Sequence, residues 1–279
     1  MLHRPQSTAE ALQLLGQDGA TILAGGTDIF PAHVDRPPPK ALVDISRLPG
    51  MRGISRNGRT LRIGAATTWT DIARAGLPPA FDMLRQAALE VGAQQIQNRG
   101  TIGGNLCNAS PAADGVPPLL ALEAKVELVS VRGPRLLGLQ DFLIGNRQTA
   151  RAPDEIMTAI VIDDELPEAR STFVKLGARK YLVISIVMIA ALVEMDSGGR
   201  IREARIAIGS ASAVAQRLHA LERRLAGMTP GSGLANAVTD DMLAGLSPID
   251  DIRATAGYRR DAAAELLRRT LVQLCEARS

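Results

Sequence analysis

Ile22-Leu23-Ala24-Gly25-Gly26-Thr27-Asp28 is a short apolar run that leads directly into two glycines. A buried strand followed by such a loop can gather backbone N–H groups around an anion, because glycine allows close approach and positive φ angles. Thr27 adds a hydroxyl donor. The carboxylate of Asp28 would repel a phosphate, so we expect it to cap or brace the loop. Taken alone, this stretch also fits an ordinary structural turn.

A second glycine-rich stretch is Asn98-Arg99-Gly100-Thr101-Ile102-Gly103-Gly104-Asn105-Leu106, and the polar residues Asn108, Ser110 and Asp114 follow it. We expect a loop near residues 100–105. Polar groups at this density need partners if they are buried, which favours a ligand site over a solvated loop. Neither stretch is a G-x-G-x-x-G fingerprint or a G-x-x-x-x-G-K-S/T loop, so a Rossmann dinucleotide site and a P-loop are disfavoured.

The composition is that of an ordinary globular protein. Of the 279 residues 46% are apolar and 22% are charged, enough for a sizeable core. Aromatic residues make up 3% and the formal charge is +3 with scattered basic residues, which argues against nucleic-acid binding. Two cysteines, Cys107 and Cys275, are too few for an iron–sulfur cluster or a structural zinc site. We expect a cytoplasmic protein without signal peptide or membrane span, because the longest apolar run is short.

Sequence patterns predict the elements of the N-terminal part. Ser7 and Glu10 form a capping-box pair at the start of a first helix, which ends near Gly16. Residues 1–50 then resemble a βαβ lobe. Apolar runs and alternation predict strands at residues 21–24, 41–45, 60–65, 125–131 and 155–162, and helices at 81–91 and 117–122.

The pattern changes near residue 170. Strands are predicted at residues 171–176, 186–195 and 201–208, and the tight turn Ser197-Gly198-Gly199 makes them antiparallel. Helices are predicted at residues 213–225, 239–246 and 253–276. We place the linker at Asp163-Asp164-Glu165-Leu166-Pro167, which gives domains of residues 1–168 (lobes of about 1–50 and 51–168) and 169–279.

The chain resembles the flavoprotein subunits of molybdenum hydroxylases, a family that includes the medium subunit of aerobic carbon monoxide dehydrogenase and the FAD domain of xanthine dehydrogenase. The two glycine-rich stretches at this separation resemble the two FAD loops of that family. The resemblance covers essentially the whole chain. Further stretches that carry it are residues 63–68, 109–114, 175–180 and 184–187.

The resemblance implies an α+β fold: a two-lobed FAD-binding domain of the vanillyl-alcohol-oxidase type, followed by a three-stranded antiparallel sheet with helices. It implies non-covalent FAD. The pyrophosphate and ribityl chain would lie at the glycine stretches, Ser110 and Asp114 near the ribityl and ribose hydroxyls, and Lys175 at the polar edge of the ring, where it would stabilise negative charge on the reduced flavin. Cys107 on one face and Ile156 or Met157 on the other would flank the isoalloxazine. The implied FAD-binding residues are Leu23, Ala24, Gly25, Gly26, Thr27, Asp28, Thr101, Ile102, Gly103, Gly104, Asn105, Cys107, Ser110, Asp114, Ile156, Met157 and Lys175.

The resemblance also implies partners and a function. A large subunit would hold the molybdenum cofactor, a small subunit would hold 2Fe-2S clusters, and the assembly would be a dimer of heterotrimers. This chain would then be an oxidoreductase subunit that passes electrons from those clusters through FAD to an external acceptor. Two alternatives stay open at this point: a self-sufficient flavin oxidoreductase of the same fold, and a non-enzymatic assembly subunit. The sequence does not identify the substrate or the acceptor.

Overall fold

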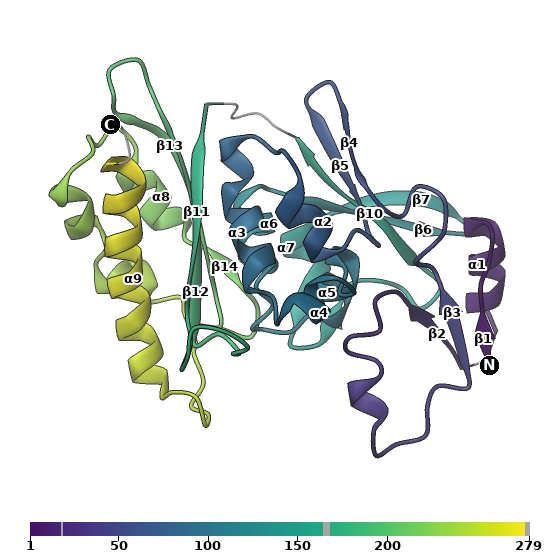
Figure 1. The fold of residues 1–279 in the computed structure, drawn as a ribbon. Coiled ribbons are helices and arrows are strands. Elements are labelled where there is room, and N and C mark those ends of the chain that lie inside the picture. The colour runs from purple at the N-terminus through teal and green to yellow at the C-terminus, as the bar shows by residue number, and fades with distance from the viewer. Residues whose placement is uncertain (18, 164–167, 277–279) are drawn as a thin grey trace. The chain divides into compact units, whose positions relative to one another are not determined.

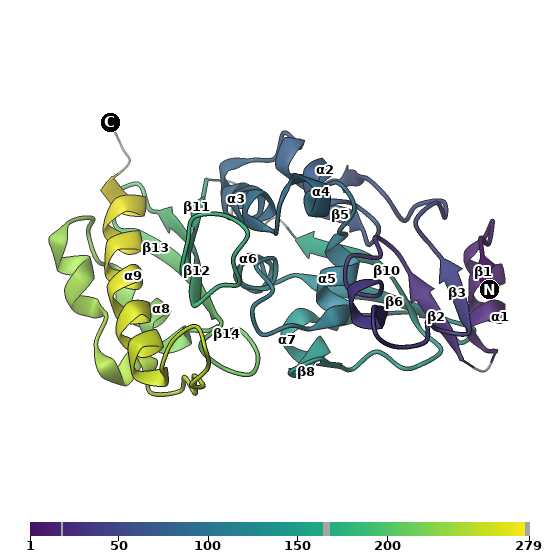
Figure 2. The same ribbon diagram turned by 60° about the horizontal axis from the view of Figure 1, so that its bottom comes forward.

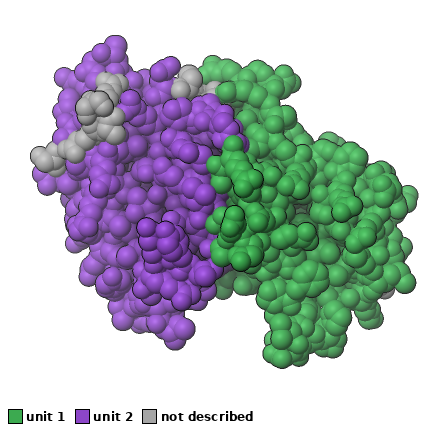
Figure 3. Space-filling model, viewed as in Figure 1, with its two compact units in different colours: residues 1–74, 93–109, 123–164 green, residues 75–92, 110–122, 165–279 purple. Residues whose placement is uncertain are grey.

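The computed structural model of the chain describes residues 1–17, 19–163 and 168–276. The chain forms two compact units (Figure 3). Unit 1 contains residues 1–74, 93–109 and 123–164, and unit 2 contains residues 75–92, 110–122 and 165–279. The linker placed at residues 163–167 lies, apart from Asp163, outside the described residues, and the domain boundary near residue 168 stays a prediction.

Unit 1 begins with a small parallel sheet whose strand order is β1-β3-β2. Helix α1 starts as its capping signal predicts, because Ser7 Oγ accepts a hydrogen bond from Glu10 N at 3.2 Å. Strand β2 ends at Leu23, and the glycine-rich residues follow it directly. The elements here are β1 (Leu2–His3), α1 (Thr8–Leu15), β2 (Ala20–Leu23), the 3-10 helix η1 (Pro31–His33) and β3 (Ala41–Asp44).

The larger sheet of unit 1 is antiparallel, with the order β4-β5-β10-β6-β7 in the described part of the chain. The alternating pattern at residues 125–131 is confirmed as β6, where Val126 and Leu128 are buried while Lys125 is exposed. Its strands are β4 (Ile54–Asn57), β5 (Thr60–Gly64), β6 (Lys125–Ser130), β7 (Gly133–Gly138) and β10 (Ile156–Asp163). Unit 1 also contains α2 (Trp69–Arg74), α4 (Gln94–Gln97), α5 (Ile102–Asn108), α7 (Leu139–Phe142), β8 (Leu143–Gly145) and β9 (Gln148–Thr149).

Unit 2 is built around an antiparallel sheet in the order β11-β12-β13-β14. The three predicted strands and their antiparallel pairing are confirmed as β11 (Arg170–Leu176), β12 (Val187–Met195) and β13 (Ile201–Gly209). The fourth, β14 (Gln216–Arg217), was not predicted. It pairs with Ala207 and Ile208 of β13. Because Gln216 and Arg217 lie inside the range predicted to be helical from residue 213, α8 is limited to His219–Leu225.

The helices of unit 2 cover both faces of this sheet. Helices α8 and α9 lie on one face, and α3 and α6 lie on the other (Figures 1 and 2). The helix predicted at residues 239–246 is only a 3-10 turn, since Gly245 and Pro248 disfavour its extension. The helical elements are η2 (Pro79–Phe81), α3 (Asp82–Glu90), α6 (Val116–Ala121), α8 (His219–Leu225), η3 (Ser232–Ala237), η4 (Asp240–Leu243) and α9 (Ala256–Glu276).

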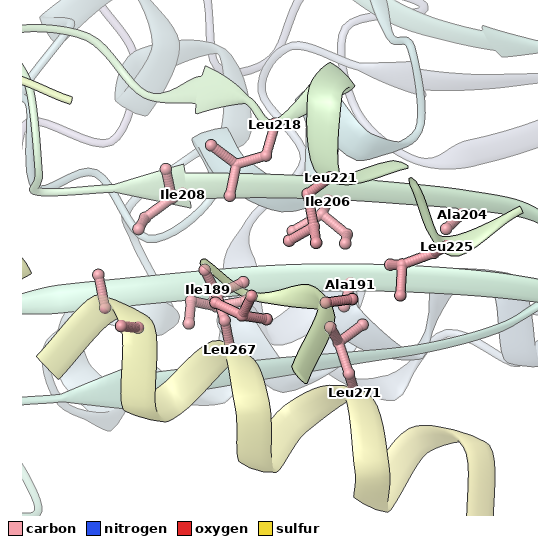
Figure 4. Packing of buried hydrophobic residues seen from close by; sticks show 14 of the residues in the cluster. Ile189, Ala191, Ala204, Ile206, Ile208, Leu218, Leu221, Leu225, Leu267 and Leu271 are labelled. Atoms are coloured by element: carbon pink, nitrogen blue, oxygen red, sulfur yellow. The ribbon is translucent and has the colours of Figure 1, made fainter. Parts of the chain in front are cut away.

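Strand β12 explains why its sequence is apolar without alternation. Ile189 and Ala191 face α8 and α9. On the opposite face, Met188 lies beside Gly209 of β13, which also adjoins Pro117 of α6. Both faces are therefore covered, and the whole strand from Val187 to Glu194 is buried. Figure 4 shows Ile206, Ile208, Leu218, Leu221, Leu225, Leu267 and Leu271 closing this core from β13, α9 and the α8 region.

Candidate cofactor site

The first glycine segment, defined as residues 24–28, leaves its backbone donors unused. In the described part of the chain none of the N–H groups of residues 25–28 donates a hydrogen bond. Gly26 has φ +76°, and a Cβ there would lie 2.5 Å from the ring of Phe30. Successive N–H groups in a turn of this kind form a concavity that suits an anion. The segment therefore offers four consecutive donors to a ligand.

The second glycine segment, defined as residues 101–105, is not the loop that the sequence predicts. Thr101 is the N-cap of α5, which begins at Ile102, and this capping overrides the expectation that a glycine pair marks a loop. The first N–H groups of the helix already have acceptors in unit 1. Ile102 donates to Thr67 O at 3.0 Å, Gly103 to Ala65 O at 2.9 Å, and Gly104 to Thr101 Oγ1 at 3.1 Å.

The first glycine segment packs against the backbone that precedes the second, and the second packs against the backbone of Ala65. A Cβ added to Gly25 would lie 2.0 Å from the carbonyl oxygen of Arg99, just before the second segment. A Cβ added to Gly103 would lie 2.7 Å from the carbonyl oxygen of Ala65. Real Cβ atoms do not approach so closely, so glycine is required at both positions. The structure thus brings the first segment next to the residues that precede the second, and their pairing around FAD stays a prediction.

Asp28 braces the first glycine segment, as the sequence predicts. Asn108 Nδ2 donates to Asp28 Oδ1 at 2.8 Å, and Arg147 Nη1 donates to Asn108 Oδ1. Sequence reasoning missed Arg147. Its only signal was its place in the turn Gly145-Asn146-Arg147, far from either glycine segment in the sequence.

Helix α5 carries two further residues of the implied site. The side-chain oxygen of Asn105 is buried and has no hydrogen-bond partner among the described residues. Such an oxygen needs a donor, which a bound ligand can supply. Burial raises the pKa of the Cys107 thiol to about 11, although the charge of Arg151 acts in the opposite direction. The thiol is therefore protonated at neutral pH, which fits a small packing residue better than a reactive one.

Ile156 and Met157 begin β10, where α5 contacts that strand. Their exposed fractions are 0% and 3%, so both side chains are buried. In the sheet they pair with Val129 and Leu128 of β6. Their contact with a flavin ring stays a prediction.

The remaining implied residues belong to unit 2. Lys175 Nζ donates to Asp114 Oδ2 at 2.7 Å and to the carbonyl oxygen of Glu90 at 3.3 Å. Ser185 Oγ donates to Asp114 Oδ1 at 2.6 Å. Burial raises the pKa of the Asp114 carboxyl, and Lys175 and Ser185 oppose that shift. Ser110 accepts from the N–H of Ala112 in the following turn.

Asp114 and Lys175 thus form a buried ion pair, with side-chain exposures of 8% and 6%. Sequence reasoning named these two residues but missed Ser185, which completes the hydrogen bonding of Asp114. A carboxylate and an ammonium at this depth need such partners, because an unpaired buried charge is costly. The roles of Asp114, Lys175 and Ser110 toward FAD stay predictions.

Three other features of the described residues bear on the site. They contain no group of three or more His, Cys, Asp or Glu side chains arranged to hold a metal ion. None of their helices combines the length and the apolar character needed to cross a membrane. Cys107 and Cys275 are not joined by a disulfide.

Comparison with known proteins shows which family the chain belongs to. Residues 1–163 match the family described as the FAD binding domain in molybdopterin dehydrogenase, and residues 172–274 match the CO dehydrogenase flavoprotein C-terminal domain. The chain is 39% identical to the nicotinate dehydrogenase FAD-subunit of Eubacterium barkeri over 70% of this chain and 69% of that relative. It is 31% identical to the carbon monoxide dehydrogenase medium chain of Hydrogenophaga pseudoflava over 96% and 94% of the two chains.

Solved structures agree with this placement. A chain of the Cu,Mo-CO dehydrogenase superposes with a TM-score of 0.92 at 30% identity, covering 100% of this chain and 98% of that one. A chain of quinoline 2-oxidoreductase from Pseudomonas putida 86 superposes with a TM-score of 0.91 at 27% identity, covering 99% and 96%. The α+β architecture implied by the sequence is confirmed. The chain belongs to the family of FAD-binding flavoprotein subunits of molybdopterin dehydrogenases.

Proposed function

We propose that the first glycine segment holds the diphosphate of FAD and that the second glycine segment fixes the shape of the first. The chain is an FAD-binding electron-transfer subunit of a molybdenum-containing hydroxylase or dehydrogenase. The observation that carries the proposal is the row of four unused N–H groups at residues 25–28. A diphosphate needs donors of this kind, and no lysine is required.

The residues of unit 1 fit this cofactor in two ways. Each charge-assisted hydrogen bond to a phosphate contributes about 1.5–3 kcal/mol, so a few of them suffice to hold a dinucleotide. The unpartnered oxygen of Asn105 can accept from a hydroxyl or N–H group of the same ligand. FAD, when bound, supplies the redox chemistry, and the protein supplies binding and orientation.

We further propose the remaining contacts with FAD and the route that electrons take. Cys107 and Ile156 or Met157 would pack against the flavin, Ser110 and Asp114 would bind near its ribityl and ribose hydroxyls, and Lys175 would supply positive charge. Partner subunits carry the molybdenum cofactor and the iron–sulfur clusters, and electrons reach an external acceptor from this chain. A dimer of heterotrimers and a cytoplasmic location remain part of the proposal.

The test is to express the chain with its large and small partner subunits and to measure flavin content and visible absorbance. Gly26→Ala should weaken FAD binding, because alanine is strained at φ +76° and its Cβ would lie 2.5 Å from the ring of Phe30, which follows the donor row. Gly50→Ala is the matched control, since Gly50 has a similar φ of +74° with nothing within 4 Å of a Cβ. A colourless wild-type chain in an assembled complex would overturn the proposal. So would a folded Gly26→Ala chain that binds FAD as tightly as the wild type.

A further inference from the structure

The Asp28–Asn108–Arg147 relay joins the first glycine segment to the end of α5. We propose that Asn108 and Arg147 are positioning residues for FAD: they restrain the Asp28 carboxylate so that it neither occupies the unused N–H groups beside it nor opposes the diphosphate. This inference rests on the proposed function and deepens it. None of the predicted FAD contacts includes Asn108 or Arg147.

The relay has a fixed direction. A guanidinium can only donate hydrogen bonds and a carboxylate can only accept them. Asn108 must therefore turn its oxygen to Arg147 and its nitrogen to Asp28, as the contacts show. The amide is thereby aligned between a positive and a negative charge, which strengthens both hydrogen bonds.

The position of Arg147 is set by its backbone. Arg147 lies in the turn between β8 and β9 with φ +55°, an uncommon conformation for a residue with a side chain. Its N–H donates to the carbonyl oxygen of Ala109 at 2.9 Å, and Ala109 is the left-handed C-cap of α5. The backbone of Arg147 is thus tied to the helix end that carries Asn108. This is more than a chance meeting of two surface side chains.

Asp28 needs such a restraint for two reasons. Aspartate side chains readily accept hydrogen bonds from neighbouring backbone N–H groups, and the N–H groups of residues 25–28 are unused. An unrestrained carboxylate would therefore compete with a diphosphate for these donors. It would also repel the diphosphate directly, since like charges at short range disfavour each other even with solvent present. Asn108 removes the competition, and the charge of Arg147 offsets the repulsion.

The experiment measures FAD affinity of the full-length chain after flavin removal, by quenching of flavin fluorescence. Because Asp28 and Arg147 are exposed, we expect Asn108→Ala and Arg147→Ala each to weaken FAD binding only about fivefold. Asp28→Asn removes the carboxylate and should tighten FAD binding about twofold. In the Asp28→Asn background, Asn108→Ala and Arg147→Ala should lose most of their effect.

Two controls separate positioning from general support of the fold. Arg132→Ala breaks another exposed ion pair of unit 1, with Asp154, and should leave FAD affinity unchanged. Riboflavin, which lacks the diphosphate, should bind Asn108→Ala and Arg147→Ala as it binds the wild type. Thermal unfolding of the flavin-free variants shows whether they fold. If Asn108→Ala does not fold, Arg147→Ala carries the test because it removes only an exposed side chain.

Each outcome decides the inference. Equal weakening by Asn108→Ala with and without Asp28→Asn would mean that Asn108 merely supports α5 and would overturn it. Wild-type affinity in both single variants would also overturn it while leaving the proposed function standing. A wild-type chain that binds no FAD would overturn the proposed function as well, so the two failures are distinguishable.

Discussion

The first and second glycine segments share a composition but use their backbones in opposite ways. Residues 25–28 leave their N–H groups without acceptors among the described residues, whereas residues 102–104 donate to Thr67, Ala65 and Thr101. The first segment follows a strand that ends at Leu23, and the second starts a helix capped by Thr101. The same pair of glycines therefore leaves backbone donors open to a ligand in one segment and uses them for packing within the fold in the other.

The largest expected effect comes from the contact between the first segment and the backbone just before the second. Gly25→Ala places a Cβ against Arg99 O at 2.0 Å, so the first segment must move, and we expect a loss of about 3 kcal/mol in the free energy of unfolding together with loss of FAD. Gly76→Ala, where nothing lies within 4 Å of a Cβ, is the control. Denaturant unfolding and flavin content measure both. A fully loaded, equally stable Gly25→Ala chain would show that the segments need not approach so closely.

Asn105 tests whether the second segment contributes a direct contact as well as packing. Its side-chain oxygen has no partner to lose, so Asn105→Ala should cost the flavin-free chain less than about 0.5 kcal/mol of stability. FAD affinity should fall about tenfold, the loss of one hydrogen bond to the ligand. The measurement is a fluorescence titration beside denaturant unfolding. Unchanged affinity would remove Asn105 from the site and leave the second segment with a packing role only.

Thr101 and Thr27 allow a direct test of the two segments, because both segments contain a threonine. Thr101→Ala removes the N-cap of α5 and should lower the free energy of unfolding by about 1 kcal/mol, whereas Thr101→Ser should retain it. Thr27 caps no helix. Thr27→Ala should therefore lower FAD affinity and leave the stability of the flavin-free chain unchanged. Thermal unfolding without FAD separates the two. The comparison fails if Thr27→Ala is the more destabilising change.

The smallest expected effect is on the reactivity of the Cys107 thiol of α5. With the pKa raised to about 11, thiolate alkylation by iodoacetamide should be slow near pH 8 and should rise with pH until about pH 11. The raised pKa also means that the thiol stabilises the folded chain below its unfolded pKa of about 8.5, and that this contribution is lost as the pH rises toward 11. Peptide mass spectrometry reports the labelling. A plateau in the rate near pH 9 would contradict the raised pKa of this thiol.

The sequence predicts the fold well where local signals and tertiary contacts agree. The capping pair Ser7 and Glu10 marks α1, and the turn at residues 197–199 makes β12 and β13 antiparallel. It fails where contacts distant in the sequence decide. Strand β14 forms because Gln216 and Arg217 pair with β13, and no local pattern announces that pairing.

The site divides in the same way. The sequence predicts that Asp28 braces the first glycine segment, because its carboxylate would repel a phosphate there, and the structure confirms that Asn108 of α5 holds this carboxylate. The partner Arg147 could not, because a turn near residue 147 brings it to Asn108 through the fold. The start of α5 at Ile102 could have been predicted, since a threonine immediately before an apolar residue is an N-cap signal, but the two glycines that follow favoured a loop.

Amide hydrogen exchange at residue resolution, with and without FAD, measures which N–H groups of the two segments receive the cofactor. In the flavin-free chain the N–H groups of residues 25–28 should exchange with little protection, and those of residues 102–104 should be protected. FAD should slow residues 25–28 by at least about tenfold and change residues 102–104 little. Equal protection of both segments before FAD is added, or a change confined to residues 102–104, would contradict the account.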